Sequence, residues 1–146
     1  MDPLFASKEE YEEFSERQSQ YNVMTGDLET YEGNCYLGID AGSTTTKAAL
    51  VGEDGALLYS FYSNNNGSPL KTTIRAIQDI YKKLPDTAKI VRSCSTGYGE
   101  ALIKAALLLD EGEVETVSHY YAAAFFDPDV DCILDIGGQD MKCIKI

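Results

Sequence analysis

The pattern Asp-x-Gly-x-x-x-x-Lys occurs twice in this chain, at residues 40–47 and 135–142, each time at the end of an apolar run. A second apolar run follows each copy, so each copy predicts two short strands joined by a glycine turn. A glycine turn can direct several backbone N–H groups at one anion, and an aspartate beside it can hold a cation. The repeat therefore predicts a site for a phosphate group and its metal ion.

The rest of the chain predicts three consecutive strands and then alternating helices and strands. Strands are expected at 35–40, 45–52 and 56–63, because Glu53-Asp54-Gly55 is typical of a hairpin turn. After Ser68-Pro69, apolar residues recur every three or four positions and predict an amphipathic helix at 70–84. The remaining elements are expected as a strand at 89–95, a buried helix at 99–109, a strand at 114–117, a helix at 119–126 and a hairpin at 131–146. Helices between the later strands imply parallel pairing within a five-stranded mixed sheet.

Three segments are expected along the chain. Residues 1–34 carry nine acidic residues against Lys8 and Arg17, and they predict an acidic connector with a short helix. Residues 35–128 are expected to form an α/β lobe with helices flanking the mixed sheet. Residues 129–146 repeat the opening of that lobe, so we expect them to be the first hairpin of a truncated second lobe.

Composition excludes several classes of function. The net charge of −12 argues against binding to the phosphate backbone of DNA or RNA. The four cysteines, Cys35, Cys94, Cys132 and Cys143, show no spacing typical of a metal site. The acidic N-terminus does not resemble a signal peptide, and no apolar run reaches membrane-spanning length. We therefore expect a cytoplasmic protein with reduced thiols that binds neither nucleic acid nor membranes.

Neither glycine turn fits the Walker A pattern or the Gly-x-Gly-x-x-Gly dinucleotide turn. The alternative is a pair of ordinary hairpin turns, in which Asp and Gly are common. Two copies with Asp, Gly and Lys in register favour phosphate binding instead. In this interpretation Asp40 and Asp135 hold Mg²⁺ directly or through water. The phosphate oxygens accept hydrogen bonds from nearby N–H groups and from the hydroxyls of Ser43, Thr44, Thr45 and Thr46.

The motifs also resemble those of a known family. Residues 38–47, Gly-Ile-Asp-Ala-Gly-Ser-Thr-Thr-Thr-Lys, resemble the first phosphate loop of the superfamily that contains actin, sugar kinases and heat-shock chaperones. Residues 135–140, Asp-Ile-Gly-Gly-Gln-Asp, resemble its second phosphate loop. With Ser-Thr-Gly-Tyr-Gly at 95–99, they are similar to the activator ATPases of 2-hydroxyacyl-CoA dehydratases and benzoyl-CoA reductases. Residues 113–116 and 140–143 resemble large multidomain members, in which an acidic connector precedes the second of two activase-like units.

The resemblance implies a ribonuclease-H-like (actin-like ATPase) fold that binds ATP and Mg²⁺ in a cleft between two lobes. ATP hydrolysis would drive electron delivery to a dehydratase or a related CoA-thioester reductase. Implied partners are the nucleotide, the remainder of the polypeptide and the dehydratase or reductase. Implied catalytic residues are Asp40, Asp135 and Gln139, with Gln139 orienting the attacking water. Implied nucleotide-binding residues are Gly42, Ser43, Thr44, Thr45, Thr46, Lys47, Gly137, Gly138 and Gln139.

One position departs from the small activators. They place a cysteine at the N-terminus of the helix after the fifth strand, and its symmetric pair in a homodimer holds a four-iron four-sulfur cluster. The matching position here is Ser118, and none of the four cysteines matches a cluster ligand. We therefore expect no iron–sulfur cluster on this chain.

Several alternatives stay open. A structural role is favoured for His119, the single histidine. Residues 96–99, Thr-Gly-Tyr-Gly, are equally typical of a ligand site at a strand end and of a tight turn with a packed Tyr98. The rival functions are a small-molecule kinase lobe and a catalytically silent interaction module. We expect Asp40 and Asp135 to approach one another, and we expect the isolated chain not to hydrolyse ATP at an enzymatic rate.

Overall fold

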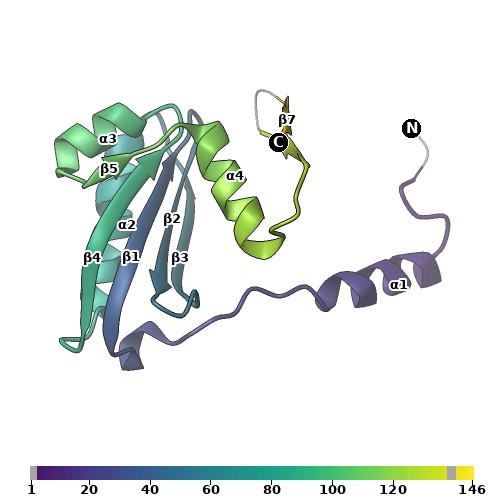
Figure 1. Ribbon diagram of the computed structural model, residues 1–146, viewed down its shortest axis with the longest axis horizontal. Coiled ribbons are helices and arrows are strands. Elements are labelled where there is room, and N and C mark those ends of the chain that lie inside the picture. The colour runs from purple at the N-terminus through teal and green to yellow at the C-terminus, as the bar shows by residue number, and fades with distance from the viewer. Residues whose placement is uncertain (1–2, 138–140) are drawn as a thin grey trace.

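The computed structural model describes residues 3–137 and 141–146. A five-stranded sheet with strand order β3-β2-β1-β4-β5 forms the body of the molecule, and β6 and β7 form a separate two-stranded sheet (Figure 1). The strands are β1 (Gly33–Ala41), β2 (Thr45–Gly52), β3 (Leu57–Asn64), β4 (Ala88–Thr96), β5 (Glu111–Gly112), β6 (Cys132–Ile136) and β7 (Met141–Lys145). The helices are α1 (Lys8–Ser19), α2 (Pro69–Lys83), α3 (Glu100–Leu107) and α4 (Glu115–Phe126), with a short 3-10 turn at Leu28–Thr30.

The pairing confirms the expected mixed α/β sheet. β1, β2 and β3 form an antiparallel meander, whereas β1 pairs with β4 and β4 pairs with β5 in parallel. The expected strands at 35–40 and 89–95 therefore lie side by side. α2 begins where its sequence signals predict, because the Ser68 side chain accepts a hydrogen bond from the N–H of Lys71 and Pro69 occupies the first turn.

The core lies between one face of the sheet and helices α2 and α3. Alternate residues of β1 are buried, as expected for a strand with one covered face. Leu50 of β2, Ile80 of α2 and Ile103 of α3 are completely buried in this layer. Burying one such side chain contributes about 1.5–3 kcal/mol, so these contacts hold the helices onto the sheet.

The opposite face of the sheet carries small side chains. Gly38, Ala49, Ser60 and Cys94 lie in register across four strands. They help to line a pocket of about 570 Å³ that also includes Ser118 of α4. α4 contacts the sheet near both of its ends, through Ser118 at one end and through Phe125 beside Gly55 at the other.

Two expectations for the second half of the chain are wrong. The fifth strand is Glu111–Gly112 rather than 114–117, and Glu115 already lies in the first turn of α4. A run of four residues is too short to distinguish a strand from a helix start, and an acidic residue in the first turn favours the helix. The expected buried helix at 99–109 is α3, which buries only Ile103 and leaves Leu102 and Leu108 exposed.

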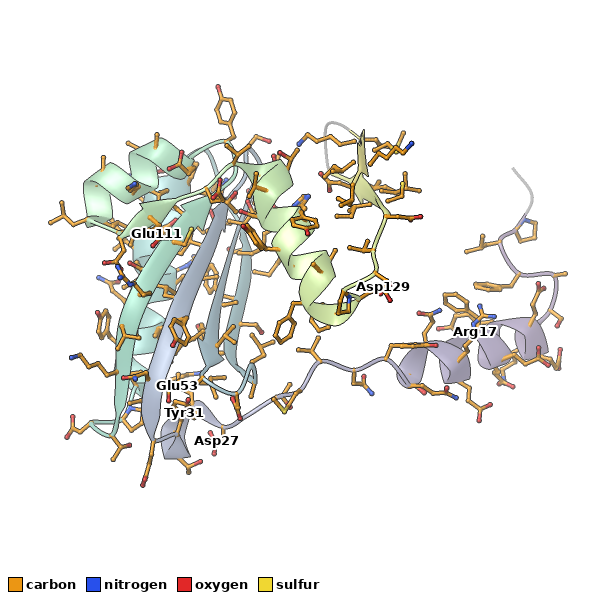
Figure 2. All side chains as sticks on the ribbon, viewed as in Figure 1. Arg17, Asp27, Tyr31, Glu53, Glu111 and Asp129 are labelled. Carbon is orange, nitrogen blue, oxygen red and sulfur yellow. The ribbon has the colours of Figure 1, made fainter. Side chains whose placement is uncertain are left out.

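The segment before β1 is partly attached to the sheet. Residues around Thr25 pair with the start of β3, and Leu28 is buried in the core. The Tyr31 hydroxyl donates to the carbonyl of Asn34 and accepts from the N–H of Glu53 (Figure 2). α1 has no buried residue and stands apart from the sheet (Figure 1). No helix in the described residues combines the length and apolarity needed to cross a membrane.

The β6–β7 hairpin lies beside α4 (Figure 1). Its outer face carries exposed apolar residues, among them Leu134, Ile136 and Met141. Cys132 and Cys143 are also exposed, and their Sγ atoms lie 3.7 Å apart. The hydrogen bond between these thiols is the main cause that raises the pKa of Cys132.

Candidate functional site

Both repeated motifs place their Asp and Lys directly opposite one another on paired strands. Asp40 faces Lys47 across β1 and β2, and Asp135 faces Lys142 across β6 and β7. The carboxylate of Asp40 accepts a hydrogen bond from Lys47 Nζ at 2.9 Å, and Lys142 Nζ lies 3.8 Å from Asp135 Oδ2. The repeat in the sequence is therefore also a repeat in strand register, and part of the role of each lysine is to pair with its aspartate.

The first glycine turn is held in place by Asn65, a buried residue that follows β3. Its side-chain amide donates to the carbonyl of Gly42 at 2.8 Å, and its backbone N–H donates to the carbonyl of Thr44 at 2.9 Å. Its side-chain oxygen accepts from the Thr46 hydroxyl at 2.6 Å. The expectation that the Thr46 hydroxyl contacts phosphate is therefore wrong, because that side chain is fully buried and bonded to Asn65.

This anchoring leaves the N–H side of the turn available. The two carbonyls that would repel an anion are tied to Asn65, whereas nothing in the described part of the chain accepts from the backbone N–H of Ser43 or Thr44. The side chains of Ser43 and Thr44 are exposed, and that of Thr45 is half-buried. The turn thus offers unpaired N–H and hydroxyl donors, which is the requirement for an anion-binding turn.

Asp40 keeps one oxygen unused at the base of this turn. Its Oδ2 accepts from Lys47, but Oδ1 is buried and has no hydrogen-bond partner among the described residues. Gly97 adopts φ +87° beside it, and a Cβ at that position would come within 2.5 Å of Oδ1. Because Tyr98 is 92% exposed, the alternative of a tight turn with a packed tyrosine is wrong, although the turn is tight against Asp40.

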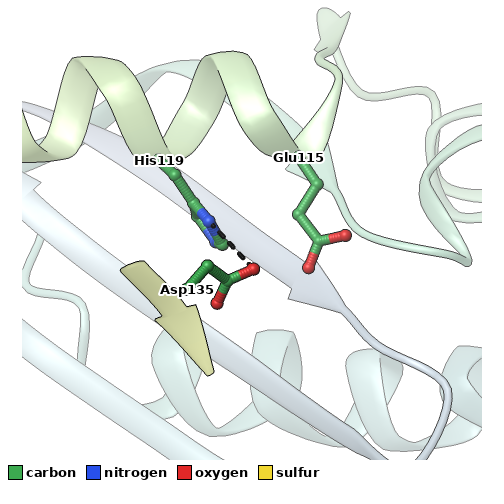
Figure 3. A group of neighbouring side chains, drawn as sticks. All are labelled: Glu115, His119 and Asp135. Atoms are coloured by element: carbon green, nitrogen blue, oxygen red, sulfur yellow. Dashed lines mark ion pairs between the residues drawn. The ribbon is translucent and has the colours of Figure 1, made fainter. Parts of the chain in front are cut away.

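The second aspartate lies near two residues that the sequence analysis did not assign to the site, His119 and Glu115. Asp135 Oδ2 lies 3.4 Å from His119 Nδ1 (Figure 3). Glu115 Oε2 accepts a hydrogen bond from Lys142 Nζ at 3.0 Å. The His119 contact is short enough for an ion pair with a protonated imidazole, but it lacks hydrogen-bond alignment. Glu115 and His119 are four positions apart on α4 and therefore share one face of the helix. The four-residue spacing of Glu115 and His119 is the sequence signal that could have placed both residues in one site.

A series of contacts leads from Asp40 toward Asp135. Asp40 and Thr96 are register partners at the ends of β1 and β4, and Ser118 Oγ donates to Thr96 Oγ1 at 3.2 Å. Ser118 directly precedes His119 on α4, and His119 Nδ1 lies 3.4 Å from Asp135 Oδ2. Both aspartates therefore lie toward the same end of the sheet, and their close approach stays a prediction.

Gly137 follows β6 and is exposed, whereas Gly138 and Gln139 lie outside the described residues.

Comparison with known proteins gives this geometry a context. The sequence profile of the BadF/BadG/BcrA/BcrD ATPase family matches residues 37–146, which include both motifs and the described strands from Leu37 of β1 onward. The chain belongs to this ATPase family. Its predicted resemblance to the activator ATPases is thereby confirmed.

Individual family relatives agree with this assignment. An uncharacterised protein of Escherichia coli is 33% identical over 110 residues, covering 75% of this chain and 40% of the relative. The (R)-2-hydroxyglutaryl-CoA dehydratase activating ATPase of Acidaminococcus fermentans is 29% identical over 114 residues, covering 75% of this chain and 42% of the relative. The chain thus spans about two fifths of the length of these relatives.

A solved structure supports the same fold. The activator of the 2-hydroxyisocaproyl-CoA dehydratase from Clostridium difficile, crystallised with bound ADPNP, superposes with a TM-score of 0.65 at 27% identity. The match covers 77% of this chain and 41% of that protein. The expected actin-like lobe with a five-stranded mixed sheet is therefore confirmed.

Proposed function

We propose that this chain supplies the phosphate-binding half of an ATPase unit that activates a CoA-thioester dehydratase or reductase. The observation that carries the proposal is the turn at 42–46, in which Asn65 ties down the carbonyls of Gly42 and Thr44. The N–H groups of Ser43 and Thr44 are left without acceptors in the described chain. A phosphate oxygen is the natural acceptor for such a group of donors.

The residues present also fit a nucleotide-bound Mg²⁺ ion. Asp40 Oδ1 is a buried oxygen without a hydrogen-bond partner in the described residues, and Mg²⁺ prefers carboxylate and water oxygens. Asp40 and Asp135 would hold the ion directly or through water. When bound, the ion neutralises charge on the phosphates during phosphoryl transfer. We assign Gly137, Gly138 and Gln139 to the second phosphate turn, with Gln139 orienting the attacking water.

Other residues of the chain prepare the site. Lys47 pairs with Asp40 and lies over the Tyr62 ring, so it places a positive charge beside the phosphate turn. Asn65 fixes the turn at 42–46 through its hydrogen bond to the Gly42 carbonyl, and Gly97 allows the 96–99 turn to approach Asp40 closely. Catalysis in such a site is mainly positioning and electrostatic stabilisation, which rigid turns of this kind supply.

An activating role is supported by two relatives, each 29% identical to this chain: a dehydratase activating ATPase of Acidaminococcus fermentans and a dehydratase activator of Clostridioides difficile. We propose that ATP hydrolysis by the complete unit is coupled to electron delivery. Because the chain spans about two fifths of their length, we propose that a second lobe completes the cleft. The first partner is then the remainder of its own polypeptide, and the second is a dehydratase or reductase. Ser118 donates to Thr96 at the start of α4, where the small activators carry a cluster cysteine, so we propose that this chain holds no cluster.

The test uses protein extended through the second lobe and measures ATP hydrolysis with Mg²⁺. Asp135→Ala should abolish most turnover, because it removes a carboxylate that positions the metal, and Ser118→Ala should leave turnover within about twofold of the parent. The 146-residue chain alone should show no enzymatic turnover. Full activity of Asp135→Ala in the two-lobed protein would refute the assignment.

A further inference from the structure

We propose that Glu115, His119 and Asp135 form a binding site for a divalent transition-metal ion of the Mn²⁺ or Fe²⁺ class. One ligand atom from each residue lies within 4.8 Å of the other two, and all three side chains are half-buried. Glu115 and His119 extend from α4 toward Asp135 on β6 (Figure 3). The site goes beyond the proposed nucleotide chemistry and shares only Asp135 with it.

The backbone already brings the three ligands together. Glu115 and His119 are one turn apart on α4, so their side chains emerge on the same face of the helix. Asp135 is the fourth of the five residues of β6, where pairing with Lys142 on β7 fixes its direction. Ligands about 2.1 Å from one ion are separated from each other by roughly 3–4 Å. Small side-chain rotations are therefore sufficient to close the present cluster around an ion.

The types of ligand select the class of metal. Two carboxylates alone suit Mg²⁺ or Ca²⁺, whereas an imidazole favours transition metals. His119 Nδ1 is buried, faces Asp135 and makes no hydrogen bond among the described residues, so a metal ion would give this nitrogen a partner. The mixed set of one imidazole and two carboxylates therefore favours Mn²⁺ or Fe²⁺ over Mg²⁺.

Lys142 shows that the cluster attracts a positive charge. Its ammonium lies 3.0 Å from Glu115 Oε2 and 3.8 Å from Asp135 Oδ2, and it partly neutralises both carboxylates. A metal ion bound by the same carboxylates would have to compete with this ammonium. Removing the lysine charge should therefore strengthen metal binding, whereas a purely structural ion-pair network predicts no such gain.

Mn²⁺ binding to the complete chain, without nucleotide, tests the proposal. Titration followed by electron paramagnetic resonance should show one site, and pulsed measurements should show coupling to an imidazole nitrogen. His119→Gln should remove that coupling and weaken binding at least about tenfold. Glu115→Gln should also weaken binding, and Lys142→Gln should tighten it. The exposed Asp129, on the connection between α4 and β6, provides the matched control Asp129→Asn (Figure 2), which should leave the affinity unchanged.

Circular dichroism verifies that each variant is folded. If His119→Gln does not fold, the affinity of Glu115→Gln for Mn²⁺ tests the site instead. The proposal is overturned if Mn²⁺ binds without nitrogen coupling, if it does not bind, or if Lys142→Gln fails to tighten binding. Since nucleotide is absent throughout, failure here leaves the phosphate turn at 42–46 untouched. Conversely, a failed ATPase test would leave the metal site standing.

Discussion

At the scale of single residues, Asn65 determines how the first motif can function. A glycine turn has both carbonyl and N–H groups, and it binds anions only when the N–H groups face the ligand. Asn65 engages the carbonyls of Gly42 and Thr44 and the hydroxyl of Thr46. The repeated motif was visible in the sequence, but this support was not, because Asn65 lies 19 positions after Thr46 in a polar stretch typical of a loop.

Asn65→Ala should destabilise the protein by about 1–3 kcal/mol, because it leaves the buried Thr46 hydroxyl and the Gly42 carbonyl without partners. Chemical denaturation measures the change. The matched control is Asn64→Ala, since Asn64 is the exposed neighbour and its side chain makes a single hydrogen bond within the described residues, to the nearby N–H of Asn66. An equal loss of stability in both variants would contradict the role assigned to Asn65.

At the scale of elements, the sequence predicted the helices and strands whose apolar residues recur with a clear periodicity or whose ends carry a clear boundary signal. The meander β1–β3, helix α2 and strand β4 carry such signals, namely alternation, a Ser-Pro helix start and a Glu-Asp-Gly turn. The stretch from α3 to α4 carries none, because two largely apolar helices flank an acidic segment at 110–115. There tertiary contacts decide the structure: β5 is only two residues long and exists through pairing with Cys94 and Ser95.

One of those tertiary contacts predicts a pH dependence. The Asp110 carboxylate accepts from both the hydroxyl and the backbone N–H of Ser93, and these bonds hold the pKa of Asp110 below its ordinary value. The contact ties the segment between α3 and β5 to strand β4. Because the folded pKa is lower than the unfolded one, the unfolded state binds protons more readily in acid. The contribution of Asp110 is therefore present at neutral pH and is lost as the pH falls below the ordinary range of an aspartate.

Asp110→Asn should flatten the acid side of the stability curve while lowering stability at neutral pH. Urea midpoints measured across the acid range for both proteins test this expectation. Asp54→Asn, in the turn between β2 and β3, serves as a comparison at another aspartate that accepts a backbone N–H. If the acid slope of Asp110→Asn matches that of the parent, the Ser93 contact has no measurable linkage to pH.

At the scale of the whole molecule, the candidate site is assembled from elements distant in the sequence. The first turn joins β1 to β2, Thr96 ends β4, Ser118 lies on α4, and Asp135 lies on β6. Pattern and spacing predicted the first turn and the strand pairing around the second motif, because each is a local feature. They did not predict that Glu115 and His119 would face Asp135, since that depends on where α4 packs beside the hairpin.

The central claim is that the turn at 42–46 binds phosphate, and amide chemical shifts measured during titration of the chain with Mg²⁺ and ADPNP test it most directly. Binding should be weak, with saturation only at millimolar ligand, because one lobe provides few contacts. The account predicts that the amide signals of Ser43 and Thr44 shift most among residues 3–137, and that Asn65→Ala reduces these shifts. Unchanged signals at 42–46, or larger shifts on α1 or β3, would contradict the claim.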